Sequence, residues 1–250
     1  MKNRSALIVL GIALLLTACA SKPAPSSKRA ATRDFSAQKW LEARWIMEVL
    51  TSAEAGSRRL HVARWTKPVV VVAINGNETQ LAALQQVIGQ INAALDGAHP
   101  LTLAAPGTDL ARSANVQVQF APQKDWPALG KKWGMPVPLP DGGLDGLQFV
   151  SWNEKIELET GVVVIADGLK GDLLQHTLLE ELYQTMGIRN DSGFFPDSIV
   201  YESDGDTGGR TLLSERDKKL IRFLYLHVPP GTRPDGLAKI IDEHWVYGVK

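Results

Sequence analysis

Apolar side chains recur along much of this chain at the spacing of amphipathic helices. Residues 36–56 carry them three or four positions apart, with Trp40 and Trp45 among them. Such a stripe is typical of a helix with one face on a core, so both tryptophans are expected to pack on the domain. Residues 78–97 repeat the pattern, with apolar positions at Leu81, Leu84, Val87, Ile88, Ile91 and Leu95. The pattern therefore predicts two long helices, each with one buried face.

Shorter segments have the pattern of β-strands. Residues 69–75 form a β-branched run typical of a strand buried on both faces, and residues 115–122 alternate so that three apolar side chains share one face. Further strands are predicted in residues 101–106, 147–153 and 157–167, before a helix near residue 180 and a largely helical end. This order predicts an α+β fold, with one mixed sheet packed against helices.

Prolines and glycines are concentrated between residues 122 and 146. Such a stretch predicts a long loop at the surface. Residues 19–34, rich in serine, alanine, proline and lysine, predict a flexible tether ahead of a single domain formed by residues 35–250.

The first residues predict export and attachment to a membrane. Residues 1–18 have a basic start and an apolar run too short to span a bilayer, as in a secretory signal peptide. They lead through Leu-Thr-Ala to Cys19, the only cysteine of the chain. An unlipidated signal peptide with a chance cysteine is the alternative.

The Leu-Thr-Ala-Cys segment resembles the lipobox of bacterial lipoproteins. This resemblance implies a diacylglyceryl group and an acylated amine on Cys19, and more than one acyl chain gives stable anchoring. Ala20, and not aspartate, follows the cysteine, which in that family favours the outer membrane over retention at the inner one. The expected location is therefore the periplasmic face of the outer membrane.

The charge balance excludes one class of partner. The chain has a formal net charge of +0, which becomes −2 once Lys2 and Arg4 leave with the signal peptide. A balance of this kind gives no electrostatic case for nucleic-acid binding.

Residues 178–191, LLEELYQTMGIRND, have the rhythm of the zinc-protease helix H-E-x-x-H-x-x-G-x-x-H. With Gly187 as the glycine, Glu181 takes the place of the general base. The three ligand positions are then taken by Glu180, Gln184 and Asn190. All three imidazoles of the template are thus absent.

This donor set predicts no metal cofactor, because zinc prefers nitrogen, sulfur and carboxylate over neutral amides. A displaced site that uses His176, one turn before Glu180, is the alternative. Otherwise Glu180, Gln184 and Asn190 are expected to hydrogen-bond one another near Gly187, with positive φ at that glycine, and Asp191 follows as a further member of this cluster.

The downstream sequence resembles the last helix of metzincins, with Val200 where their methionine turn would lie. The matching positions are Ser214, Asp217, Ile221, Leu224 and Tyr225. Ser214 also reads as an ordinary helix N-cap.

From about Phe35 to Lys239 the chain is similar to a bacterial family of unknown function whose members are often lipoproteins. The positions that carry this similarity are Arg64, Trp65, Pro68, Glu180, Glu181, Gln184, Gly187, Asn190, Asp191, Ser198, Ile199, Asp217, Leu224, Tyr225, Pro230 and Gly231. The resemblance implies a metzincin-like (zincin-like) fold in which amides replace imidazoles throughout the family, and it supplies no activity.

A retained frame with lost ligands favours a pseudo-metalloprotease that acts as a binding module. Its expected partner is a peptide, peptidoglycan or another envelope protein. The alternative is an active hydrolase with Glu181 as general base, with or without an atypical metal. A base without an identified metal or oxyanion donor lacks the charge stabilisation that peptide hydrolysis requires. A third interpretation is an assembly lipoprotein with no functional site in this region.

Overall fold

The computed structural model describes residues 27–52, 61–105, 114–133, 144–203 and 209–248, and the side chains from residue 36 onward. Residues 37–250 form one compact unit, and residues 1–36 form another. Cys19 and the predicted signal peptide therefore lie outside the described residues.

A five-stranded sheet runs through the larger unit, with its strands in the order β2-β1-β3-β5-β4. The first four strands in this order are parallel, and β4 pairs antiparallel with β5 at one edge. The predicted mixed sheet is confirmed. The strands are β1 (Val69–Ile74), β2 (Leu101–Leu103), β3 (Val116–Ala121), β4 (Gly146–Trp152) and β5 (Leu158–Ala166).

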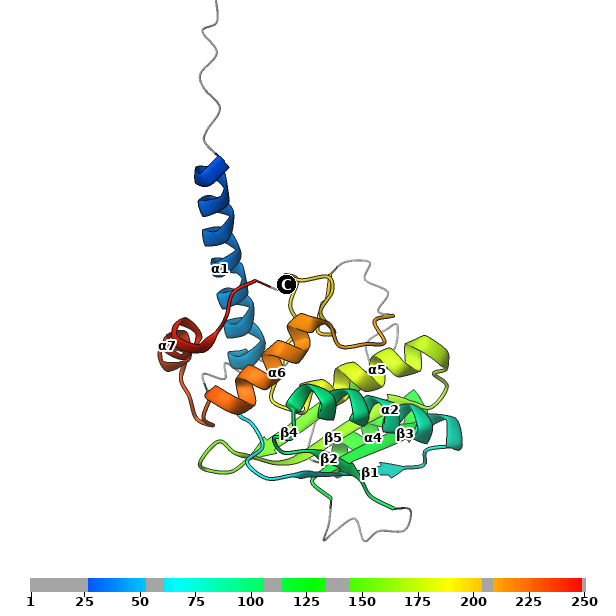
Figure 1. Ribbon diagram of the computed structural model, residues 1–250. Coiled ribbons are helices and arrows are strands. Elements are labelled where there is room, and N and C mark those ends of the chain that lie inside the picture. Colours follow the sequence, from blue (N-terminus) through cyan, green and yellow to red (C-terminus); the bar gives the residue numbers. More distant parts are fainter. Residues whose placement is uncertain (1–26, 53–60, 106–113, 134–143, 204–208, 249–250) are drawn as a thin grey trace, which may run out of the picture. The chain divides into compact units, whose positions relative to one another are not determined.

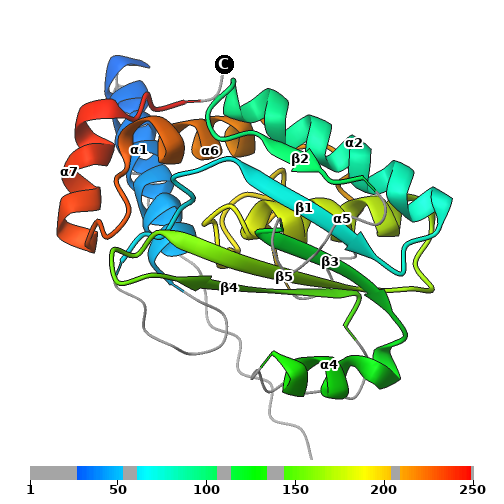
Figure 2. The same ribbon diagram turned by 90° about the horizontal axis from the view of Figure 1, so that it is seen from below.

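Two helices, α2 (Glu78–Leu95) and α5 (Gly171–Gln184), lie along one face of this sheet (Figures 1 and 2). The remaining helices are α1 (Ser27–Thr51), α4 (Trp126–Lys132), α6 (Glu215–His227) and α7 (Pro234–His244), and a 3-10 turn (Gln123–Asp125) precedes α4. Within the described residues, none of the helices combines the length and the apolar character needed to cross a membrane.

The alternation in β3 assigns its side chains to faces as predicted. Val116, Val118 and Phe120 are buried in the main core, together with the apolar stripe of α2. The opposite face of the sheet carries a second, smaller apolar cluster formed by Ala121, Trp126, Val162, Val164 and Ala166. The sheet is thus covered on both faces next to β5.

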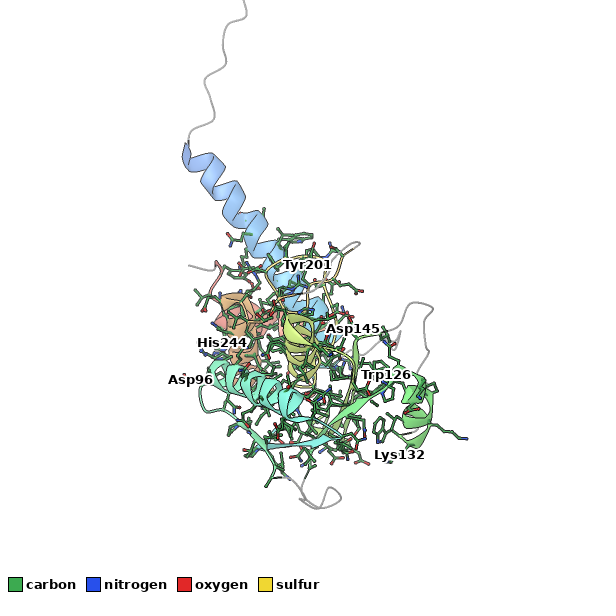
Figure 3. The ribbon with its side chains drawn as sticks, turned by 90° about the vertical axis from the view of Figure 1, so that its right-hand side faces the viewer. Asp96, Trp126, Lys132, Asp145, Tyr201 and His244 are labelled. Atoms are coloured by element: carbon green, nitrogen blue, oxygen red, sulfur yellow. The ribbon has the colours of Figure 1, made fainter. Side chains whose placement is uncertain are left out.

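The prediction of a loop throughout residues 122–146 is wrong in its first part, because α4 lies there. Trp126 is fully buried and its Nε1 donates to Ala121 O at 3.1 Å. Figure 3 shows Trp126 on the side of α4 that faces the sheet. Pro127 falls in the first turn of the helix, where a missing N–H costs nothing, so proline does not exclude a helix here. Residues 134–143 lie outside the described residues.

The prediction that Trp40 packs on the domain is also wrong. Its side chain is 57% exposed, and Arg44 lies 5.2 Å from the centre of its ring. The buried stripe of α1 consists of Glu42, Trp45, Ile46, Val49 and Leu50, at helical spacing that leaves Trp40 on another side. A carboxylate therefore occupies a position on the buried stripe.

Helix α1 begins at Ser27, earlier than the helix predicted in residues 36–56. The helix thereby includes the last eight residues of the segment predicted as a tether. The rest of that segment, residues 19–26, lies outside the described residues.

Candidate functional site

Helix α5 carries most of the predicted site residues and packs closely against the start of the edge strand β4. A Cβ atom at Gly146 would lie 2.5 Å from Thr177 Cγ2 and 2.7 Å from Glu181 Oε1. The carboxylate of Glu181 therefore lies beside the first residue of β4. Any side chain at position 146 would require the side chains of Thr177 and Glu181 to move.

The face of β4 toward α5 continues from Gly146 to Trp152. Val150 and Trp152 pack against the main core, while Leu147 packs against the smaller cluster on the other face. The guanidinium of Arg189 lies 5.4 Å from the centre of the Trp152 ring. The edge strand is therefore bordered by an acidic group at one end and a cationic group at the other.

On α5, the buried His176 pairs with the partly buried Glu180, one turn further along the helix. His176 Nε2 lies 3.4 Å from Glu180 Oε2, and His176 Nδ1 lies 2.9 Å from Arg210 O. Because a carbonyl oxygen can only accept, the hydrogen of the ring belongs on Nδ1. The imidazole is thus oriented between α5 and the segment that precedes α6.

At the end of α5 the chain turns back on itself. Gln184 Nε2 donates to Asp191 Oδ1 at 2.8 Å, and Asn190 Nδ2 donates to Asp191 O. Gly187 has φ +104°, which confirms the predicted positive φ. A Cβ atom there would lie 2.2 Å from Ala63 O, so both conformation and space require glycine. The turn brings Gln184 and Asp191 together.

The donor set determines what a metal ion would find at this site. In the part of the chain that the structure describes, no group of three His, Cys, Asp or Glu side chains is placed to hold an ion. His176 and Glu180 supply two donors at most, and the Gln184 amide donates toward Asp191 and not toward an ion. Such a set does not fit the three or four protein ligands typical of zinc.

A second group of residues holds the C-terminal end of α5, where helix carbonyls lack partners within the helix. Trp65 Nε1 donates to Thr185 O at 2.9 Å, and Tyr225 Oη donates to Met186 O at 3.1 Å. Arg64 Nε donates to Val228 O at 2.7 Å, and its guanidinium lies 5.6 Å from the centre of the Tyr225 ring. We call Arg64, Trp65, Gly187 and Tyr225 the clamp. Burial raises the pKa of the Tyr225 hydroxyl, which keeps it a hydrogen-bond donor.

Asp217 fixes the segment after the turn to the start of α6. Its buried carboxylate accepts from Ser198 Oγ at 2.6 Å and from Ile199 N at 3.0 Å. It also accepts from Ser214 Oγ at 2.8 Å, and Ser214 is the N-cap of α6, as its sequence position predicted. Burial raises the pKa of Asp217, and these hydrogen bonds oppose the rise.

Sequence reasoning missed Gly146 and Arg210 as neighbours of the site. Gly146 was counted only as the end of a glycine-rich loop, and its contact with α5 depends on a strand 31 residues away in sequence from Thr177. Arg210 contributes a backbone carbonyl, for which the side-chain pattern carries no signal.

The arrangement places one carboxylate, Glu181, beside the edge of a sheet, while Gln184 donates a hydrogen bond to Asp191 across the turn.

Comparison with known proteins gives a family and two structural neighbours. A family model described as "Protein of unknown function (DUF2927)" matches residues 41–243. A search of curated proteins finds no match. One solved structure of myroilysin is 12% identical with a TM-score of 0.40, covering 65% of this chain and 95% of that one. A second, a crystal structure of myroilysin, is 12% identical with a TM-score of 0.38, covering 72% and 93%. TM-scores below 0.5 support no conclusion about this chain.

Proposed function

The chain belongs to the DUF2927 family, whose function is unknown, and from that premise we propose that it is a lipid-anchored envelope protein with a zincin-like domain that binds an extended peptide and does not hydrolyse it. The observation that carries the proposal is the place of Glu181, whose carboxylate lies against Gly146 at the start of the edge strand β4. The peptide would lie along β4, on the side away from β5.

The position of β4 supports a peptide as the ligand. This strand is the last of the sheet, and its outer side has no strand partner among the described residues. An edge strand offers backbone N–H and C=O groups that an extended peptide can pair with. Glu181 adds a negative charge next to that edge, so a peptide with a lysine or arginine near this end is favoured.

The polar contacts on α5 support binding without hydrolysis. Three residues take the ligand positions of the zinc-protease template. The Glu180 carboxylate lies beside His176, the Gln184 amide donates to the Asp191 side chain, and the Asn190 amide donates to the backbone carbonyl of Asp191. Metal-assisted hydrolysis needs an ion to polarise water and carbonyl, which this donor set is poorly suited to hold.

Peptide selection tests the binding step. Random decapeptides displayed on phage are selected on the immobilised chain, and the enriched sequences are synthesised and their affinities measured. Glu181→Lys should weaken them about tenfold or more, because a like charge would face the basic residue. The matched control is Glu159→Lys, which makes the same charge change on the exposed surface of the neighbouring strand β5.

Backbone N-methylation of the selected peptide distinguishes strand pairing from side-chain binding. Methyl groups on alternate residues remove either the N–H groups that face β4 or those that face solvent. One of the two methylated peptides should lose binding and the other should keep it. Equal affinities for both methylated peptides, or for Glu181→Lys and wild type, would refute binding along β4.

The anchor is tested separately. Cys19→Ser should move the protein out of the membrane fraction, because acyl chains on Cys19 are proposed as its attachment. A variant that still sediments with the outer membrane after a high-salt wash would show that lipid is not the anchor.

Metal analysis tests the alternative, a hydrolase with Glu181 as general base. Elemental analysis of the purified chain, followed by calorimetry with zinc, should find no tight binding in wild type. The triple variant Glu180→His, Gln184→His and Asn190→His should gain measurable zinc affinity, since ligand type dominates binding. Stoichiometric zinc in wild type that is lost in Glu180→Ala would favour the hydrolase.

A further inference from the structure

Glu42 is a carboxylate on the buried stripe of α1, with its side chain completely inaccessible to solvent. Burying a carboxylate is costly unless hydrogen bonds and an opposite charge replace its hydration. The groups that replace water around Glu42 therefore show what this side chain holds in place.

Two of the donors to Glu42 come from the C-terminal segment Trp245–Gly248, which we call the latch. Trp245 Nε1 donates to Oε2 at 2.7 Å, and the backbone N–H of Gly248 donates to Oε1 at 3.1 Å. A third donor, Gln38 Nε2, lies one turn away on α1 and reaches Oε1 at 3.1 Å. Figures 1 and 2 show the latch, in red after α7, running back beside α1.

The latch makes few other contacts with the domain. Lys219 Nζ donates to Val246 O and lies 4.2 Å from the centre of the Trp245 ring. The ring of Phe223 meets Trp245 edge-on at 5.3 Å. Val246 itself is 74% exposed. The side chain of Trp245 is buried in the core, and that of Tyr247 is partly buried against it, with Lys39 Nζ 4.9 Å from the centre of its ring. Within the latch, the polar contacts to Glu42 are those that reach a buried charge.

The charge that balances Glu42 is shared with the loop that follows the site. Arg216 Nη1 lies 3.5 Å from Glu42 Oε1, and Arg216 Nε lies 3.7 Å from Asp197 Oδ1. The same guanidinium lies 3.7 Å from the centre of the Phe195 ring. Residues 192–197, the site loop, begin next to Asp191, which bonds Gln184 of the site.

We propose that the latch is a conformational device that controls the site loop through Glu42 and Arg216. While the latch is docked, Trp245 and Gly248 satisfy Glu42, and Arg216 is available to Phe195 and Asp197. When the latch leaves, Glu42 loses two donors and draws the guanidinium of Arg216 toward itself, because a buried carboxylate needs those hydrogen bonds. The site loop then loses its cation. This proposal does not depend on the lipid anchor or on any ligand at β4.

Hydrogen–deuterium exchange of the full chain in detergent tests the coupling. Trp245→Phe keeps the ring and removes only the N–H, and Glu42→Gln keeps the shape and removes the charge. Trp245→Phe should raise the exchange of amides in residues 192–197 about fivefold or more, the lower range for coupled sites. Glu42→Gln should leave their exchange unchanged, because no carboxylate then draws Arg216 away from the site loop. Exchange in β5 and α5 should stay unchanged. The matched control, Glu215→Gln, removes the exposed 2.7 Å ion pair between Glu215 and Lys218 on α6, the helix that carries Arg216, without changing Glu42 or the latch.

The reverse experiment uses reciprocity, since coupling free energy acts equally in both directions. Asp197→Asn, on an exposed side chain of the site loop, should raise exchange at the amides of the latch. It also serves if Glu42→Gln fails to fold. Faster exchange of the latch with an unchanged site loop in Trp245→Phe would overturn the proposal. An equal rise at all amides, or an equal effect of Glu215→Gln, would overturn it as well.

Discussion

The two ends of the motif on α5 serve the molecule differently. At the C-terminal end, the clamp residues Trp65 and Tyr225 hold helix carbonyls, and Gly187 fits where no other residue can. On the face toward β4, Glu181 approaches Gly146 without filling a core position. The motif on α5 therefore mixes residues that form the fold with residues of the candidate site, and only the contacts separate them.

The difference has an energetic consequence. Trp65, Gly187 and Tyr225 of the clamp are buried, and the polar atoms of both aromatic side chains are paired, so a change there leaves an unsatisfied group or a steric clash. Glu181 lies in the less buried part of α5, where a change of charge costs the fold little. Stability measurements should therefore separate the two groups.

The largest expected effect is that of Gly187→Ala. The new methyl group would meet Ala63 O at 2.2 Å, at a φ of +104° that alanine rarely adopts. Urea unfolding should show a loss of about 4 kcal/mol, or no folded protein, since strain and clash add at this position. Gly168→Ala is the control, because a Cβ atom there would meet nothing within 4 Å. Equal stability of the two variants would break the comparison at the clamp.

Asp217→Asn should follow in size, with a loss of about 2–3 kcal/mol. The amide nitrogen cannot accept, so one or more of the donors from Ser198, Ile199 and Ser214 would lose its partner. Asp172→Asn is the control, because it removes an acidic charge from the first turn of α5 without such partners among the described contacts. Thermal unfolding of both variants measures the difference. Similar losses would mean that charge at a helix start, and not hydrogen bonding, explains Asp217.

Glu181→Gln should change the free energy of unfolding by less than about 1 kcal/mol, because glutamine keeps the shape and this site lies outside the core stripe. The same variant should weaken the selected peptides of the binding experiment. Chemical denaturation and affinity measurements on one preparation give both numbers. A loss of stability as large as that of Asp217→Asn would place Glu181 with the fold and not with the site.

The smallest effect concerns pH and the clamp. Burial and the charge of Arg64 lower the pKa of His99, whose ring lies 5.8 Å from that of Tyr225. A histidine with a lowered pKa in the folded state is neutral there, so its stabilisation is present above its ordinary pKa and is lost as pH falls through the folded value.

The midpoint of thermal unfolding should therefore fall slightly further between pH 7 and pH 5 in wild type than in His99→Asn. Asparagine is the suitable replacement, because His99 has φ +47°. Identical pH profiles of the unfolding midpoint would show that protonation of His99 does not change the stability of the folded chain.

The strands and the long helix α2 follow from short-range patterns and were predictable. Val116, Val118 and Phe120 alternate, and the period of α2 places its stripe on the core. The exposure of Trp40 was not predictable in the same way, because two overlapping apolar stripes run along this helix in the sequence. Only the packing of the helix determines which stripe is buried. Helix α4 was hidden because Pro127 signals a loop as often as a first helical turn.

The sequence by itself determined the mixed α and β order, the turn at Gly187 and the N-cap at Ser214, because each depends on neighbours within one turn or one strand. The tertiary structure alone decided that Gly146 meets Glu181 and that the latch reaches Glu42. The first contact joins residues 35 positions apart in the sequence, and the second joins residues 203 positions apart. No local propensity encodes which distant surface a side chain will face, since that choice is made by packing of the whole core.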